Sequence, residues 1–207
     1  MKDPLEKMKR CPVIVVLLAV LPMTALGQAV PSDPSPCASA EARAFDFWIG
    51  DWEIEARDRP PGAEHWTKNE TWFRTRVRSD LSGCVVIEES IDKVGADTLV
   101  VGLSMTSYNV HLGRYQQMWI DRQGNTLEYV GGREGERMVL YLEPTASSGE
   151  PLVPFQKTTQ LRMVFDEITE DRLVWRYQYS TDEGNTWTST NEAVYRRGAP
   201  LHRLDRP

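Results

Sequence analysis

Two adjacent glutamates, Glu88 and Glu89, are the residues of this chain best suited to acid–base chemistry. They follow an apolar run, residues 84–87, whose composition is typical of a β-strand. Neighbouring side chains on a strand point to opposite faces, so the two carboxylates cannot act together as a general acid and a general base. Only one of them can face a protein interior.

The surroundings of Glu88 decide what it can do. If Val86 and Ser90 share an inner face with Glu88, this carboxylate is buried and needs a partner. The candidate partners are the guanidinium groups of Arg76 and Arg176. Charged strand positions are usually solvated, which makes a solvent-facing or salt-bridged Glu88 the simpler expectation. Glu88 is therefore only a weak candidate for a catalytic residue.

Tryptophan is abundant, with seven residues in a chain of 207. Aromatic rings beside polar side chains suit a pocket for a ring-bearing or amphipathic small molecule, such as a sugar, a lipid or an aromatic metabolite. Large aromatic side chains are equally suited to packing in a core. The candidate ligand-binding residues are Trp52, Trp72, Glu88, Gln117, Trp119, Trp175 and Arg176.

Histidine and cysteine give no sign of a metal site. The three histidines, His65, His111 and His202, do not stand at metal-ligand spacing, and the chain has no Cys-x-x-Cys pair. A single histidine such as His111 can ligate haem in some barrels, but its neighbours predict an exposed turn residue. We therefore expect no metal and no cofactor.

The first 27 residues have the features of a secretory signal peptide. Four basic residues precede an apolar run, residues 11–26, which prolines interrupt and which is short for a membrane span. We expect cleavage after Gly27, export to the periplasm or the extracellular space, and no membrane span in the mature chain. In such an oxidising compartment Cys37 and Cys84 are expected to form a disulfide, with two unpaired thiols as the alternative.

The charge of the chain excludes two kinds of partner. Residues 1–27 hold four of the 24 basic and two of the 30 acidic residues, so their removal changes the formal net charge from −6 to −8. Nucleic acids and anionic membrane surfaces are bound by clustered Lys and Arg. We expect neither as a partner.

One β-rich domain, residues 45–198, is expected between a Pro-, Ser- and Ala-rich flexible linker, residues 28–44, and a flexible tail, residues 199–207. Within this domain, β-branched and aromatic residues recur in short runs that turn residues separate. Strands are predicted at residues 51–58, 66–77, 83–91, 98–108, 114–121, 126–131, 137–143, 157–168, 172–180 and 186–197.

Several of these runs alternate apolar and polar residues, as half-buried antiparallel strands do. One example is the set of Leu99, Val101, Leu103 and Met105. Glycine-containing hairpin loops are predicted at residues 121–125 and 131–135. Closing such a meander on itself removes both exposed edges. The sequence therefore favours an all-β, antiparallel up-and-down barrel of about ten strands, with a β-sandwich as the alternative.

The segment FDFWIGDWE, residues 45–53, is predicted to form the first strand of this barrel, with a tryptophan plug. Its Gly50-Asp51-Trp52 step resembles the Gly-x-Trp signature of lipocalins and related calycin barrels. Together with Cys37, Gly83-Cys84 and Gln117-x-Trp119-x-Asp121, it resembles a family of bacterial exported proteins of unknown function that look like such barrels. The resemblance spans most of residues 37–197. It implies a barrel fold and export from the cytoplasm, and it implies no activity.

A second local pattern lies near the C-terminus. Residues 180–187, STDEGNTW, resemble an Asp-box, a hairpin that recurs in sialidases and other β-propellers. Asp182 is suited to accept hydrogen bonds from turn amides, and Trp187 to fold over the hairpin. A propeller needs several copies and this chain has one, so we expect a structural hairpin and no sialidase activity.

These features favour an exported, non-enzymatic carrier or sensor that holds a small hydrophobic or amphipathic ligand in the barrel. The first alternative is a barrel enzyme of hydrolase or isomerase type that uses a lumen carboxylate. The second is a ligand-free envelope interaction module whose barrel is filled by side chains. A cavity lined by aromatic residues would favour the carrier, and a lumen carboxylate of raised pKa beside an open cleft would favour the enzyme.

Overall fold

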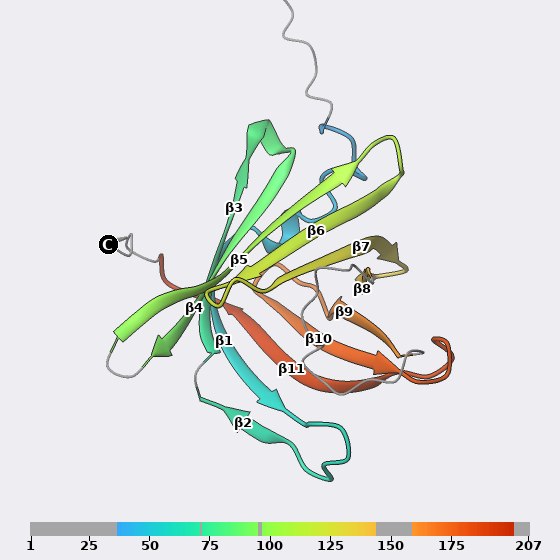
Figure 1. Ribbon diagram of the computed structural model, residues 1–207. Coiled ribbons are helices and arrows are strands. Elements are labelled where there is room, and N and C mark those ends of the chain that lie inside the picture. The colour runs from blue at the N-terminus through green and yellow to red at the C-terminus, as the bar shows by residue number, and fades with distance from the viewer. Residues whose placement is uncertain (1–36, 71, 95–96, 144–158, 201–207) are drawn as a thin grey trace, which may run out of the picture. The chain divides into compact units, whose positions relative to one another are not determined.

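Antiparallel strands make up almost all of the regular structure in the computed structural model (Figure 1). They are β1 (Gly50–Asp58), β2 (Thr67–Asn69), β3 (Trp72–Asp80), β4 (Val85–Val94), β5 (Asp97–Asn109), β6 (Arg114–Asp121), β7 (Thr126–Glu134), β8 (Arg137–Leu142), β9 (Gln160–Asp166), β10 (Arg172–Ser180) and β11 (Thr188–Arg197). Two 3₁₀ turns, η1 (Asp46–Trp48) and η2 (Leu81–Gly83), accompany them.

The structure describes residues 37–70, 72–94, 97–143 and 159–200, without the side chains of residues 72, 73, 93 and 94. The predicted signal peptide and most of the predicted linker and tail lie outside these residues.

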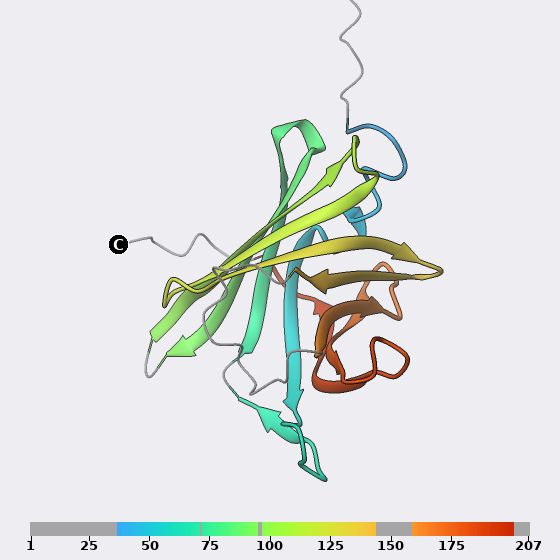
Figure 2. The ribbon, with the colours of Figure 1, turned by 45° about the vertical axis from the view of Figure 1, so that its right-hand side comes forward.

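Ten of the strands form a closed barrel. Each strand pairs with the next around the barrel, and β11 returns to pair with β1 along seven residue pairs from Trp52–Arg197 to Asp58–Asn191. The short β2 adds to the far end of β1 without joining the ring, as Figure 2 shows. Closure leaves no unpaired edge in the ring. The predicted up-and-down barrel is confirmed, and the sandwich alternative is wrong.

The strand predictions agree well with the structure in most of the barrel. The run predicted at residues 66–77 is divided into β2 and β3. The hairpin predicted at residues 131–135 is also wrong, because Gly131 lies within β7 and the chain turns at Gly135. A Cβ atom on Gly131 would lie 2.0 Å from the backbone oxygen of Val139, so the close approach of β8 explains this glycine.

Most of the predicted apolar face of β5 points away from the barrel interior, although Val101 lines the cavity. Leu103 and Met105 are 40% and 48% exposed, whereas Ser104 and Thr106 are buried. The two hydroxyl groups bond to buried polar side chains of the neighbouring strands. Hydrophobic alternation alone therefore does not identify the inner face of this strand.

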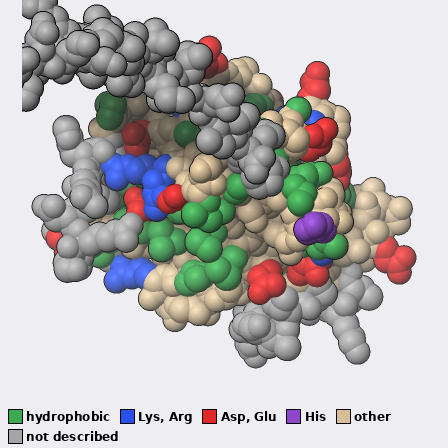
Figure 3. Space-filling model, turned by 90° about the horizontal axis from the view of Figure 1, so that it is seen from above, with side chains coloured by type: hydrophobic (Ala, Val, Ile, Leu, Met, Phe, Trp, Pro, Cys, Tyr) green, Lys and Arg blue, Asp and Glu red, His purple; other side chains and the backbone are tan. Residues whose placement is uncertain are grey.

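The segment before β1 closes one end of the barrel. The predicted disulfide is present, between Cys37 and Cys84. Phe45 and Trp48 are buried and pack edge to face against Phe165, with ring centroids 5.3 and 5.0 Å apart. Figure 3 looks onto this end, where hydrophobic side chains gather at the surface beside charged ones.

The prediction that the whole segment FDFWIGDWE forms a strand is wrong. Residues 46–48 form η1, and β1 begins at Gly50. The Trp52 indole N–H donates to the Trp48 carbonyl at 2.7 Å, and the Arg197 guanidinium lies 3.9 Å above the Trp52 ring. Gly50 has a φ of +141°, and a Cβ atom there would lie 1.9 Å from the Arg197 side chain. Glycine is favoured at this position because other residues rarely adopt this positive φ, and the Arg197 side chain also passes close to the backbone here.

Candidate functional site

The barrel encloses a cavity of about 1300 Å³. Its lining extends from Trp48, at the closed end, to Pro60 and Pro61 in the loop that follows β1. Aromatic and apolar side chains supply much of its wall: Trp119, Leu127, Tyr129, Met163, Phe165, Trp175, Tyr177, Tyr179 and Tyr195. This volume lies above the usual range for small-molecule sites, so the described side chains leave the barrel unfilled.

Glu88 is on the inner face of β4 and is only 5% exposed. Its two carboxylate oxygens lie 3.1 Å from the Thr75 hydroxyl and 3.0 Å from the Ser104 hydroxyl. Burial raises the pKa of Glu88 to about 7, although the two hydroxyl groups act in the opposite direction. The neighbouring Glu89 lies 3.7 Å from Arg76 instead.

These contacts correct both expectations for Glu88. It is buried and forms no ion pair with any described residue, and hydroxyl groups from β3 and β5 take the place of the arginine partner. The sequence did not point to Thr75 or Ser104, because they become neighbours of Glu88 only through strand pairing.

The hydrogen-bond pattern is consistent with a neutral Glu88. The Thr75 hydroxyl has one proton, and its oxygen also lies 2.9 Å from the backbone carbonyl of Glu89, which can only accept. When Thr75 donates to that carbonyl, its oxygen is able to accept a proton from Glu88. A neutral carboxyl group avoids the cost of an unpaired buried charge.

Two further carboxylates belong to the lining. Asp92 follows Glu88 on the inner side of β4, and burial raises its pKa. One Asp92 oxygen is buried and has no hydrogen-bond partner among the described residues. Asp58, at the end of β1, accepts hydrogen bonds from Asn69 and Asn191 at 2.9 and 2.8 Å. The described part of the lining includes no Lys, Arg or His.

Three other predicted binding residues line the cavity. Gln117 is buried and donates to the Thr106 hydroxyl at 2.8 Å. Trp119 lies against Gly102, where a Cβ atom would be 2.1 Å from the indole ring. Trp175 stacks on Tyr177, with ring planes inclined by 13°.

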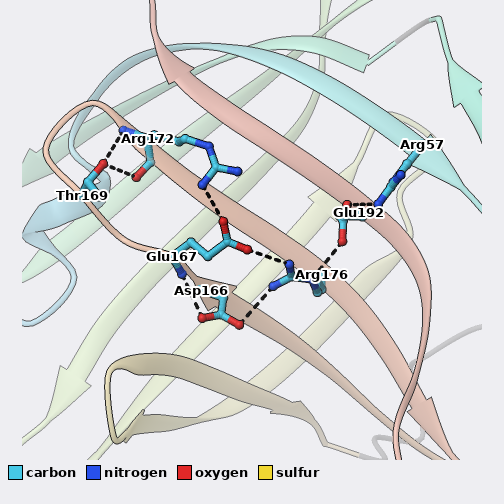
Figure 4. A network of polar contacts seen from close by, with 7 residues as sticks. All are labelled: Arg57, Asp166, Glu167, Thr169, Arg172, Arg176 and Glu192. Carbon is cyan, nitrogen blue, oxygen red and sulfur yellow. Dashed lines mark hydrogen bonds and ion pairs between the residues drawn. The ribbon is translucent and has the colours of Figure 1, made fainter.

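The remaining predicted binding residues are placed differently. Trp52 is buried in the closed end and is not among the lining residues, and the side chain of Trp72 lies outside the described part of the chain. Arg176 is on the outer face of β10, because its neighbour Trp175 faces inward. Figure 4 shows its guanidinium group among three carboxylates, with contacts at 3.0, 3.1 and 3.0 Å to Asp166, Glu167 and Glu192.

Several lining residues were not predicted. Tyr177 and Tyr179 lie on the inward side of β10, and the alternation of that strand was a signal that could have identified them. Asp58 and Asn191 had no such signal. They are far apart in the sequence and meet because β1 pairs with β11.

The Asp-box-like hairpin lies between β10 and β11. The Asp182 carboxylate accepts hydrogen bonds from the Ser180 hydroxyl and from the Thr186 amide and hydroxyl, at 2.7, 2.8 and 2.7 Å. These bonds lower the pKa of Asp182 to about 2. Trp187 donates its indole N–H to the Gly184 carbonyl at 3.0 Å. The turn mechanics account for every one of these residues, in keeping with a structural hairpin.

The described residues offer neither a metal site nor a membrane-spanning helix. No group of three or more His, Cys, Asp or Glu side chains is arranged to hold a metal ion. Within the same residues, no helix has the length and apolar character needed to cross a bilayer.

Comparison with known proteins places this chain in a family and supports the fold. A family model described as "Protein of unknown function (DUF1579)" matches residues 38–197. The crystal structure of Rv2717c from M. tuberculosis is similar, with a TM-score of 0.50, 16% identity, and coverage of 78% of this chain and 99% of that one.

The S-type phycobiliprotein lyase CPES from Guillardia theta gives a TM-score of 0.47 and 8% identity, over 77% of this chain and 93% of that one. A search of curated proteins gave no match. The likeness to Rv2717c supports the closed antiparallel barrel fold, and it gives no indication of an activity.

Proposed function

This chain belongs to DUF1579, a family of proteins of unknown function, and from the interior of its barrel we propose that it binds a small amphipathic molecule as a carrier or sensor. The observation that carries the proposal is the aromatic-lined cavity of about 1300 Å³. A cavity with a largely apolar wall and a few placed polar groups is the usual form of a small-molecule site. Such a cavity also argues against an interaction module with a filled barrel.

We further propose that the protein is exported to the periplasm or the extracellular space. The signal-like residues 1–27 support this address, and so does the disulfide between Cys37 and Cys84, since stable disulfides are rare in reducing compartments. The test is the N-terminal sequence and the fractionation of the chain expressed in a bacterial host. An unprocessed chain in the cytosolic fraction would contradict the export proposal.

The binding proposal is tested by native mass spectrometry of the protein purified from its own host. A retained small molecule, which mild denaturation releases, is the expected result. Tryptophan fluorescence then reports rebinding, because Trp48, Trp119 and Trp175 all line the cavity. If no molecule is retained, and the fluorescence does not respond to lipids, sugars and aromatic compounds, the proposal fails.

A barrel enzyme is the second candidate, because Glu88 has a pKa of about 7 and borders the cavity. A carboxyl group with a pKa near neutrality suits general acid–base catalysis. The two functions differ in one result: chemical turnover of the retained molecule that is abolished by Glu88→Gln would favour the enzyme. A molecule that is released unchanged favours the carrier.

A further inference from the structure

The charges of the barrel are separated between its two faces. The described lining of the cavity contains the carboxyl groups of Asp58, Glu88 and Asp92 and no basic side chain. Arg76 and Arg176, which the sequence offered as partners for Glu88, form their ion pairs away from the cavity lining. Among the described residues, the acidic groups of the interior therefore lack cationic partners.

Two buried polar atoms in the lining have no hydrogen-bond partner among the described residues. One is a carboxylate oxygen of Asp92, and the other is the indole nitrogen of Trp48, a side chain that is 2% exposed. Buried polar groups are nearly always hydrogen-bonded, and leaving one unsatisfied is costly. A bound molecule that supplies a donor to Asp92 and an acceptor to Trp48 would satisfy both.

The carboxyl groups are distributed along the length of the cavity. Glu88 pairs with Val77, and Val77 pairs with Gly50 at the start of β1, so Glu88 lies near the closed end. Asp92 is four residues further along β4, about 13 Å away for an extended strand, on the side of the loop after β1. Two of the three acidic groups, Glu88 and Asp92, thus follow the length of the β4 wall.

The aromatic wall supplies the other half of the site. Trp175 and Tyr177 stack in nearly parallel planes, and Trp119 lines the same cavity. Aromatic faces attract cations and also hold flat apolar bodies. An anionic ligand would meet the opposite environment, since like charges in a poorly solvated cavity repel strongly.

Building on the proposed binding function, we infer that the cavity selects cationic amines with an aromatic or amphipathic body. The ammonium group bonds to one carboxyl group of the β4 wall, either Asp92 or Glu88, and the apolar body packs on the aromatic wall. Carboxylate-bearing molecules such as fatty acids are excluded.

Three probes with the same ring test this inference: pyrenemethylamine, pyrenemethanol and pyrenecarboxylate. Their affinities are measured by isothermal titration calorimetry with the full mature chain at about pH 8, above the pKa of Glu88. We expect the amine to bind about tenfold or more tightly than the alcohol, as a charge-assisted hydrogen bond allows, and the carboxylate to bind most weakly.

Two variants identify the groups responsible. The double variant Glu88→Gln, Asp92→Asn removes two lining charges, and it is expected to abolish the preference for the amine while the alcohol still binds. Glu55→Gln, on the exposed outer side of β1, is the matched control and should keep the preference. Unchanged binding of the alcohol also shows that the double variant is folded.

Each outcome is decisive. Equal binding of the three probes, or tightest binding of the carboxylate, overturns the inference about charge and leaves the binding function standing. A preference that survives in the double variant also overturns it, since the β4 wall would then not be its source. If none of the probes binds, this inference is refuted, and native mass spectrometry judges the binding function separately.

Discussion

Glu88→Gln is expected to stabilise the ligand-free protein, and more so at high pH. The folded state holds the pKa of Glu88 at about 7, against 4.5 for an unperturbed glutamate. Because the folded pKa is raised, the folded state binds more protons than the unfolded state between these two values. The contribution of Glu88 to stability is therefore retained below pH 4.5 and lost as the pH rises through about 7.

The magnitude follows from the pKa difference. Ionising Glu88 in the folded rather than the unfolded chain costs about 3 kcal/mol, at about 1.4 kcal/mol for each tenfold change in the ionisation constant. Glutamine copies the neutral carboxyl group, because its amide can donate to Thr75 and its oxygen can accept from Ser104. The variant avoids the ionisation cost without losing a hydrogen bond.

The assay is chemical unfolding followed by circular dichroism, with the disulfide intact, at about pH 5 and about pH 8. Burial and the Glu88 charge raise the pKa of Tyr195 well above its usual value. Tyr195 therefore stays neutral at both pH values and does not contribute to the difference. We expect the two proteins to differ little near pH 5 and the variant to be more stable by up to about 3 kcal/mol near pH 8.

Glu55→Gln serves as the control, because exposed surface substitutions usually change stability by less than about 0.5 kcal/mol. A difference between Glu88→Gln and the natural protein that is the same at both pH values would refute the reasoning. So would a variant that is less stable at high pH, since this would mean that the folded state favours an ionised Glu88.

Three further predictions concern the frame of the site. Replacing Cys84 with alanine opens a loop of 47 residues, and denaturant unfolding should show a loss of about 4 kcal/mol in the chain-entropy model; an unchanged midpoint would mean that the bond is not formed in solution. Gly50→Ala introduces a side chain at positive φ against Arg197 and should lower stability by about 1–3 kcal/mol or more, whereas Gly62→Ala, which meets no atom within 4 Å, should cost less; equal losses in thermal unfolding would argue against the clash. Asp182→Ala removes the acceptor of three hairpin hydrogen bonds and should lower the melting temperature without changing ligand affinity, so a lost affinity would assign this hairpin to the binding site.

Features that depend on neighbouring residues were predictable. The strands β6 and β10 coincide with the predicted runs at residues 114–121 and 172–180, because alternation and turn residues are local properties. The hairpin around Asp182 is local for the same reason. The closed barrel followed from the number of sequential strands and the cost of leaving their edges unpaired.

The sequence by itself thus determined the fold class and brought Glu88, Gln117, Trp119 and Trp175 forward as candidates. The tertiary structure alone decided which wall each side chain occupies and what it contacts. Arg176 is excluded from the cavity by the inward orientation of its neighbour, and Asp58 gains Asn191 as a partner only when β11 closes on β1. The physical reason is that alternating apolar and polar residues show only that the two faces of a strand differ. Strand pairing and barrel closure decide which face is buried and which distant residues lie on it.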